Sequence, residues 1–117
     1  MDPLGREDAE RPNLDNHIYI YTSKFGKTDF NEIRTQVGNV FTTNLRIEEK
    51  KNYSGSDFVF FERKGIPAIA FTTGSCSDNH GPGDDADKIQ FEKLENITRL
   101  IFATVWDIAN RDESINN

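Results

Sequence analysis

The sequence is poor in cysteine, in clustered basic residues and in long apolar runs, and each shortage excludes a class of protein. Cys76 is the only cysteine, which excludes an internal disulfide and a zinc site built from several cysteines. The net charge of −6, without a block of lysines and arginines, argues against a nucleic acid or an anionic membrane as a partner. No apolar run approaches the roughly 18 residues of a membrane-spanning helix.

The amino-terminal stretch "MDPLGREDAERP" is polar and lacks the apolar core of a signal peptide. We therefore expect either an intracellular chain or one whose front is missing, and the compartment stays open. Length and composition, 117 residues of which 35% are hydrophobic, predict a single domain over residues 1–117 with one modest core. Residues 1–16 are charged and interrupted by prolines, so we expect a loop that is mobile on the nanosecond timescale.

Strands and helices alternate along the rest of the chain. Alternating β-branched and aromatic residues predict strands, whereas apolar residues three or four positions apart predict helices that end at Gly38 or Gly65. The expected order is a strand over 17–23, a helix over 28–37, an extended segment over 40–49, a helix over 56–64, a strand over 66–74 and a helix over 90–110. This alternation favours an α/β architecture with at least some parallel pairing.

The run "IPAIAFTTG" at 66–74 is almost continuously apolar, which predicts a strand covered on both faces and flanked by other strands, a central position in the sheet. Apolar residues recur at helical spacing in the last helix, namely Phe91, Leu94, Ile97, Ile101, Val105 and Ile108, and Phe102, Trp106 and Ala109 widen the apolar stripe. We expect this helix to cover one face of the sheet.

The loop "DNHGPGDDADKI" at 78–89 follows that strand and holds His80 among aspartates. Loops at the carboxyl ends of strands often carry functional groups in α/β sheets, which favours a metal ligand, whereas a histidine in a polar turn is the simpler interpretation. Asp84 could orient the imidazole or only stabilise the turn. Asp78, Asp85 and Asp87 suit turns and the entry to the last helix, whose positive end they complement.

Three stretches in this order resemble the C-terminal part of the two-zinc aminopeptidases of metallopeptidase family 28, whose fold the glutaminyl cyclases share. They are "GSDFVFFERKGIPAIAFTTG", "DNHGPGDDADKI" and "FEKLENITRLIFATVWDIAN". The front stretch "MDPLGRED" is similar to the family's "DMxGR" segment. The resemblance implies a partial three-layer zinc-exopeptidase-like sandwich, in which helices pack on a mixed sheet.

Carried over by position, the resemblance implies that Asp2 and His80 are zinc ligands, one for each ion of a two-zinc site. It implies for Asp57 a hydrogen bond near the metal or the substrate, although Asp57 could instead assist Ser56 in capping a helix. The substrate implied is a peptide with a free N-terminal residue. Members of the family are commonly exported.

The resemblance also implies residues that the chain lacks. The family places a His-x-Asp segment and a Glu-Glu pair before its "DMxGR" aspartate, and the only Glu-Glu pair here, Glu48-Glu49, comes after Asp2. Because a catalytic zinc takes about three protein ligands, we expect this chain alone not to be a competent peptidase. Two alternatives remain: a non-catalytic binding or assembly module that recruits a partner at an unpaired sheet edge, and a relative of the glutaminyl cyclase acyltransferases.

Overall fold

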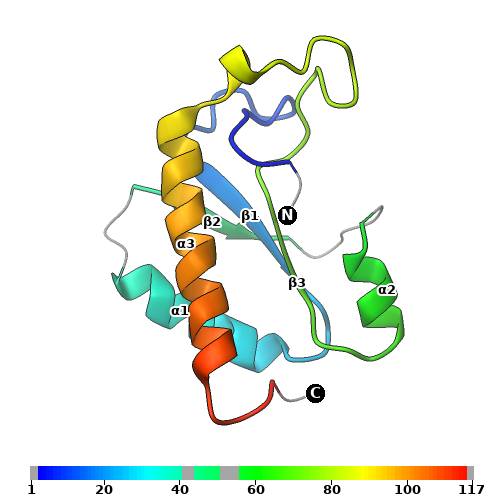
Figure 1. Ribbon diagram of the computed structural model, residues 1–117, viewed down its shortest axis with the longest axis vertical. Helices are drawn as coiled ribbons and strands as arrows, with labels where there is room; N and C mark the ends of the chain where they lie inside the picture. The colour runs from blue at the N-terminus through cyan, green and yellow to red at the C-terminus, as the bar shows by residue number, and fades with distance from the viewer. Residues whose placement is uncertain (1–2, 41–43, 51–55, 116–117) are drawn as a thin grey trace.

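A computed structural model describes residues 3–40, 44–50 and 56–115 of the chain. Within these ranges strands and helices alternate, as the sequence predicts (Figure 1). The elements in chain order are β1 His17–Thr22, α1 Lys27–Val40, β2 Arg46–Glu49, α2 Phe58–Arg63, β3 Ile69–Thr72, a 3-10 turn η1 Ala86–Lys88, and α3 Phe91–Asn110. The fold is therefore α/β.

The sheet has the order β2-β1-β3 in the described part of the chain. β1 pairs in parallel with β2 and antiparallel with β3, so the sheet is mixed, as expected. The central position expected for the strand at 66–74 is wrong: β1 is central and β3 lies at an edge. Ala70, Phe71 and Thr72 are nonetheless all buried. A continuous apolar run reports that both faces of a strand are covered, and it does not report how many strands flank it.

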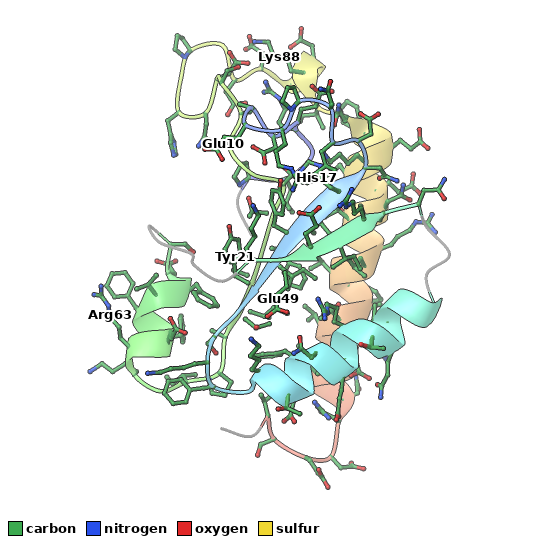
Figure 2. The ribbon with its side chains drawn as sticks, turned by 180° about the vertical axis from the view of Figure 1, so that it is seen from behind. Glu10, His17, Tyr21, Glu49, Arg63 and Lys88 are labelled. Carbon is green, nitrogen blue, oxygen red and sulfur yellow. The ribbon has the colours of Figure 1, made fainter. Side chains whose placement is uncertain are left out.

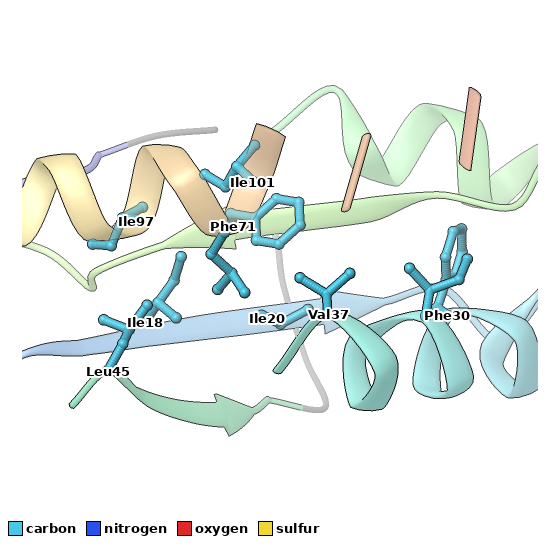
Figure 3. Packing of buried hydrophobic residues seen from close by; sticks show 10 residues of the cluster. Ile18, Ile20, Phe30, Val37, Leu45, Phe71, Ile97 and Ile101 are labelled. Carbon is cyan, nitrogen blue, oxygen red and sulfur yellow. The ribbon is translucent and has the colours of Figure 1, made fainter. Parts of the chain in front are cut away.

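The apolar core lies between the sheet and a layer formed by α1 and α3 (Figure 3). Ile18 and Ile20 project from β1 toward this layer, because alternate residues of a strand point to the same side. Ile97 and Ile101 of α3 lie in the same cluster, and Ile97 is fully buried. The expectation that the last helix covers one face of the sheet is confirmed.

The outer side of α3 corrects one expectation. Three residues expected to widen the core-facing stripe are exposed: Phe102, Trp106 and Ala109, with Phe102 and Trp106 64% and 61% exposed. Phe91 and Val105, expected within the stripe, are exposed as well. The sheet beneath α3 is narrow, so it covers only the side of the helix that carries Ile97 and Ile101. Helical spacing alone does not set the width of the buried stripe.

The end of α1 also differs from the expectation. The helix passes through Gly38 and includes Val40, which was expected to begin an extended segment. A Cβ atom built on Gly38 would meet nothing within 4 Å, so this glycine is tolerated in the helix without a steric role. Gly65, with φ +73°, does end α2 as expected, because this backbone conformation suits a residue without a side chain.

Residues 3–16 form the front segment, which holds no helix or strand and lies against the carboxyl end of β3. The Thr73 amide donates to the Pro3 carbonyl at 3.0 Å, and the Ala9 amide donates to the Ser75 carbonyl at 2.8 Å. The Gln90 amide donates to the Gly5 carbonyl at 2.8 Å. The segment is a loop, as expected. Its expected mobility stays a prediction, and the three hydrogen bonds argue against it.

Candidate functional site

Arg6 of the front segment joins two aspartates on either side of His80. Its Nη2 lies 2.7 Å from Asp78 Oδ2 and its Nη1 lies 2.8 Å from Asp84 Oδ1. Lys88 approaches the same Asp78 oxygen at 3.0 Å. The hydrogen bond from Arg6, and then that from Lys88, lower the pKa of Asp78, so this carboxylate stays charged at neutral pH. The planar fork of Arg6 thus fixes the two ends of the segment that carries His80.

His80 occupies the tip of this loop. Its φ of 60° lies in the left-handed region, which is uncommon for a residue with a side chain. The Gly81 amide donates to the Asp78 carbonyl at 2.7 Å and so closes the turn around it. The imidazole is exposed, and among the described residues no hydrogen bond to it is seen. The ring is therefore free to take a ligand or to face solvent.

The structure brings only some of the expected site residues together. Asp84 lies in the His80 loop, but its carboxylate binds Arg6, an arrangement that the sequence did not suggest. Asp57 is exposed at the start of α2, and its side chain makes no capping hydrogen bond. In Figures 1 and 2 α2 lies beside the far end of the sheet from the loop, with Arg63 well away from Lys88. Asp2 lies outside the described residues.

The second histidine, His17, is excluded as a ligand by its hydrogen bonds. It is fully buried at the start of β1, with Nδ1 2.7 Å from the Leu14 carbonyl oxygen and Nε2 2.8 Å from the Thr73 carbonyl oxygen. Lys93 of α3 also lies here, and its Nζ donates to the Arg6 carbonyl at 2.9 Å. Burial lowers the pKa of Lys93. These contacts fasten the front segment to β1, β3 and α3.

A second buried polar group lies beneath the front segment. The Tyr19 hydroxyl donates to Asp8 Oδ2 at 2.6 Å, and Asp8 is only 4% exposed. Burial, and then the hydrogen bond to Asp8, raise the pKa of Tyr19 to about 12. Gly74 follows β3 with φ +95°, and a Cβ there would lie 2.5 Å from Asp8 Cγ. This position therefore requires glycine.

Sequence reasoning assigned no role to Arg6, Asp8, His17, Tyr19 or Lys93. The available signal was the "MDPLGRED" stretch, which contains Arg6 and Asp8. The partners of these side chains are distant in sequence, with 72 positions separating Arg6 from Asp78 and 76 separating His17 from Lys93. Spacing along one chain cannot reveal such pairs.

A surface pocket of about 530 Å³ opens between the front segment and the loop that follows β3. Its lining includes Arg6, Glu7, Asp8, Cys76 and Lys88. The charges are of both signs and already engage protein partners: Arg6 and Lys88 bind aspartates of the loop, and Asp8 accepts from Tyr19. Elsewhere too, within the ranges that the structure describes, no group of three His, Cys, Asp or Glu side chains could hold a metal ion. The described residues alone therefore do not make a zinc site.

The comparisons with known proteins give one match. The model of the family described as Peptidase family M28 matches residues 2–105. No curated protein and no solved structure matches the chain. The matched range covers the front segment, the three strands, the His80 loop and α3 as far as Val105.

Proposed function

Because the chain belongs to peptidase family M28, we propose that it is an aminopeptidase-like unit in which His80 contributes a zinc ligand to a hydrolytic site acting on peptide N-termini. One observation carries the choice of His80: its ring is exposed at the tip of a loop that Arg6 holds on both sides. The chain's other histidine, His17, has both ring nitrogens against carbonyl oxygens, so it is not available to a metal.

We propose further that the zinc site of this chain is incomplete. Members of the family are generally zinc-dependent, and a catalytic zinc takes about three protein ligands. The described residues offer no cluster of three ligating side chains. We therefore expect zinc to bind this chain weakly through His80, with Asp2 as a ligand of the second ion, and we expect no hydrolysis until further ligands and a general base are supplied.

The position of His80 is held through the loop backbone by the ion pairs of Arg6 with Asp78 and Asp84. The fork of Arg6 holds the loop at residues 78 and 84, and Lys88 ties Asp78 to the turn before α3. The loop therefore presents the imidazole from a fixed place at the end of β3, which reduces the ordering cost when a ligand binds. Asp84 serves this purpose by binding Arg6, in place of the direct contact with the imidazole that the sequence suggested.

Zinc calorimetry and an aminopeptidase assay with aminoacyl anilides test the proposal. The wild-type chain is expected to bind zinc weakly and to show no turnover, and His80→Ala is expected to abolish the weak binding. Asn79→Ala, one position away in the same loop, is the matched control and should bind zinc as the wild type does. Tight stoichiometric zinc with turnover by the wild-type chain would show that its own residues complete the site.

A complementation experiment tests the catalytic part. A fragment of an active family member that carries the His-x-Asp segment and the Glu-Glu pair is added in trans. Activity that appears on mixing and disappears in His80→Ala would support the proposal. Zinc binding that is equal in wild type and His80→Ala, with no activity on mixing, would contradict it.

An assembly module is the second candidate, and the position of β3 favours it. In the described sheet β3 pairs only with β1, so it offers an edge to which another chain could add a strand. This candidate predicts that the fragment added in trans binds and protects the β3 amides from hydrogen exchange, without any activity that depends on His80. Activity that requires His80 would favour the enzyme.

A further inference from the structure

The outer side of α3 carries a set of large apolar side chains with no cover. Phe91, Phe102, Val105 and Trp106 are 66%, 64%, 53% and 61% exposed. At about 100° per residue these four positions fall within an arc of about 100°, roughly opposite Ile97 and Leu100, which face the core. We call this set the outer stripe. Exposed apolar patches of this kind mark interaction sites in soluble proteins.

The middle of the outer stripe is polar and carries one charge of each sign. Glu95 and Arg99 lie between Phe91 and Phe102, and Arg99 Nη2 is 2.6 Å from Glu95 Oε1. Both side chains are about three-fifths exposed. The pair itself has no net charge, and the exposed Glu92 lies beside it at the edge of the stripe.

We propose that the outer stripe is the interface of an antiparallel two-fold dimer of this chain. An axis that passes α3 near Thr98 sets Arg99 of each copy beside the partner's Glu95, and sets Phe91 of each copy against the partner's Trp106. A parallel pair would instead place like charges on each other. The stripe is thus self-complementary in the one orientation that a two-fold axis with antiparallel helices produces.

The area that the outer stripe offers suits such a dimer. An aromatic side chain buries about 150–250 Å² when it is covered completely. The three aromatic residues, each about three-fifths exposed or more, would therefore remove roughly 800 Å² from two copies. Val105 and the stems of Glu95 and Arg99 add to this, which reaches the roughly 1,000 Å² of a specific interface.

A second exposed apolar patch lies on and beside α2, and it differs from the outer stripe in the charges around it. Phe60, Phe61 and Ile66 are 64%, 51% and 46% exposed. The charged residues around them are the exposed Lys24, Arg63 and Lys64, together with the exposed Asp57 and the half-buried Glu62. Basic residues outnumber acidic ones here, so two copies of this patch would carry net charge of the same sign, and the patch serves as a control for the outer stripe.

Light scattering and sedimentation of the full chain test the dimer. We expect a mass twice the 13.4 kDa of one chain at high micromolar concentration, and a return to 13.4 kDa on dilution. Trp106 is the only tryptophan, so its emission should shift to longer wavelength over the same dilution. Phe102→Glu should remain a monomer with unchanged helical circular dichroism, whereas Phe60→Glu on α2 should dimerise as the wild type does.

A charge exchange tests the antiparallel geometry and does not rely on the apolar substitution. Glu95→Arg and Arg99→Glu should each weaken self-association by about fivefold, because both copies then present like charges. An equimolar mixture of the two variants should form a heterodimer at about the wild-type strength. Both positions are exposed, so both variants are expected to fold.

Five outcomes would overturn the proposal, and none depends on peptidase activity. Four of them are a wild-type chain that stays at 13.4 kDa at every concentration, a dimer that Phe102→Glu does not weaken, a dimer that Phe60→Glu weakens equally, and a mixture of the charge variants that associates no better than either alone. An open series of larger species would also contradict a closed two-fold pair.

Discussion

The two sides of β1 are buried by different means. Ile18 and Ile20 face the apolar layer of α1 and α3, where contacts are non-directional and the stabilisation is spread over many neighbouring side chains. His17 and Tyr19, the alternate residues, face polar groups that each accept one particular hydrogen bond. The apolar side should therefore give stability in proportion to the volume filled, and the polar side should give a defined position to the front segment that carries Arg6.

The largest loss is expected from the apolar side, at Ile97→Ala. Ile97 is fully buried in the cluster between α3 and β1, so the substitution leaves a cavity. We expect the free energy of unfolding to fall by about 2–5 kcal/mol. Urea unfolding at a dilution where the chain is monomeric measures it, with Phe102→Ala on the exposed side of the same helix as the control, for which the change should stay within about 0.5 kcal/mol. Equal losses at this dilution would mean that the outer side of α3 is covered within a single chain.

The next largest loss is expected on the polar side, at Gly74→Ala. The new Cβ would meet Asp8 and the backbone φ of +95° would strain any side chain, so we expect a loss of about 2–4 kcal/mol. Gly38→Ala is the matched control, because it places the same methyl group in open space on α1 and should stabilise by about 0.5–1 kcal/mol. A harmless Gly74→Ala would show that Asp8 does not lie beneath Gly74.

Tyr19→Phe removes one directed contact and leaves the ring in place. Asp8 then loses the hydroxyl at 2.6 Å, and we expect a loss of about 1–3 kcal/mol at neutral pH. Folding raises the pKa of Tyr19 from 10.0 to about 12, so the phenol's contribution is complete below pH 10 and is lost as the pH rises through 12. The wild type should therefore lose stability over this range more steeply than the variant. Parallel alkaline profiles would contradict the buried hydroxyl.

The smallest effect on stability is expected at Arg6→Lys, which keeps the charge and loses the fork. A lysine cannot reach Asp78 and Asp84 with paired donors, so the loop should gain mobility while unfolding changes by less than about 1 kcal/mol. Backbone NMR relaxation at residues 78–84 measures this change. The same spectra test the front segment, whose anchors lead us to expect order parameters near those of α3 in the wild type. Low values there would confirm the mobility that its sequence suggests.

Local sequence signals predicted most helices and strands correctly. They predicted almost none of the side-chain contacts around the candidate site. The alternation in β1 and the helical spacing of α3 are properties of neighbouring residues, so they appear in the sequence. The continuation of α1 through Gly38 depended on packing that the glycine itself does not signal. The contacts of Arg6 with Asp78 and Asp84 join positions more than 70 residues apart, and no periodic pattern connects them.

The sequence by itself determined the α/β class, the final helix, the loop that holds His80 and the resemblance that the family match confirmed, because each rests on residue types and short spacings. Only the tertiary structure decided that β3 lies at an edge, that Asp84 holds Arg6, that Asp57 lies apart from His80 and that α3 exposes its aromatic side. These features depend on which distant segments meet. Chain topology and the extent of the sheet determine these long-range contacts, and the local sequence around a residue does not predict them.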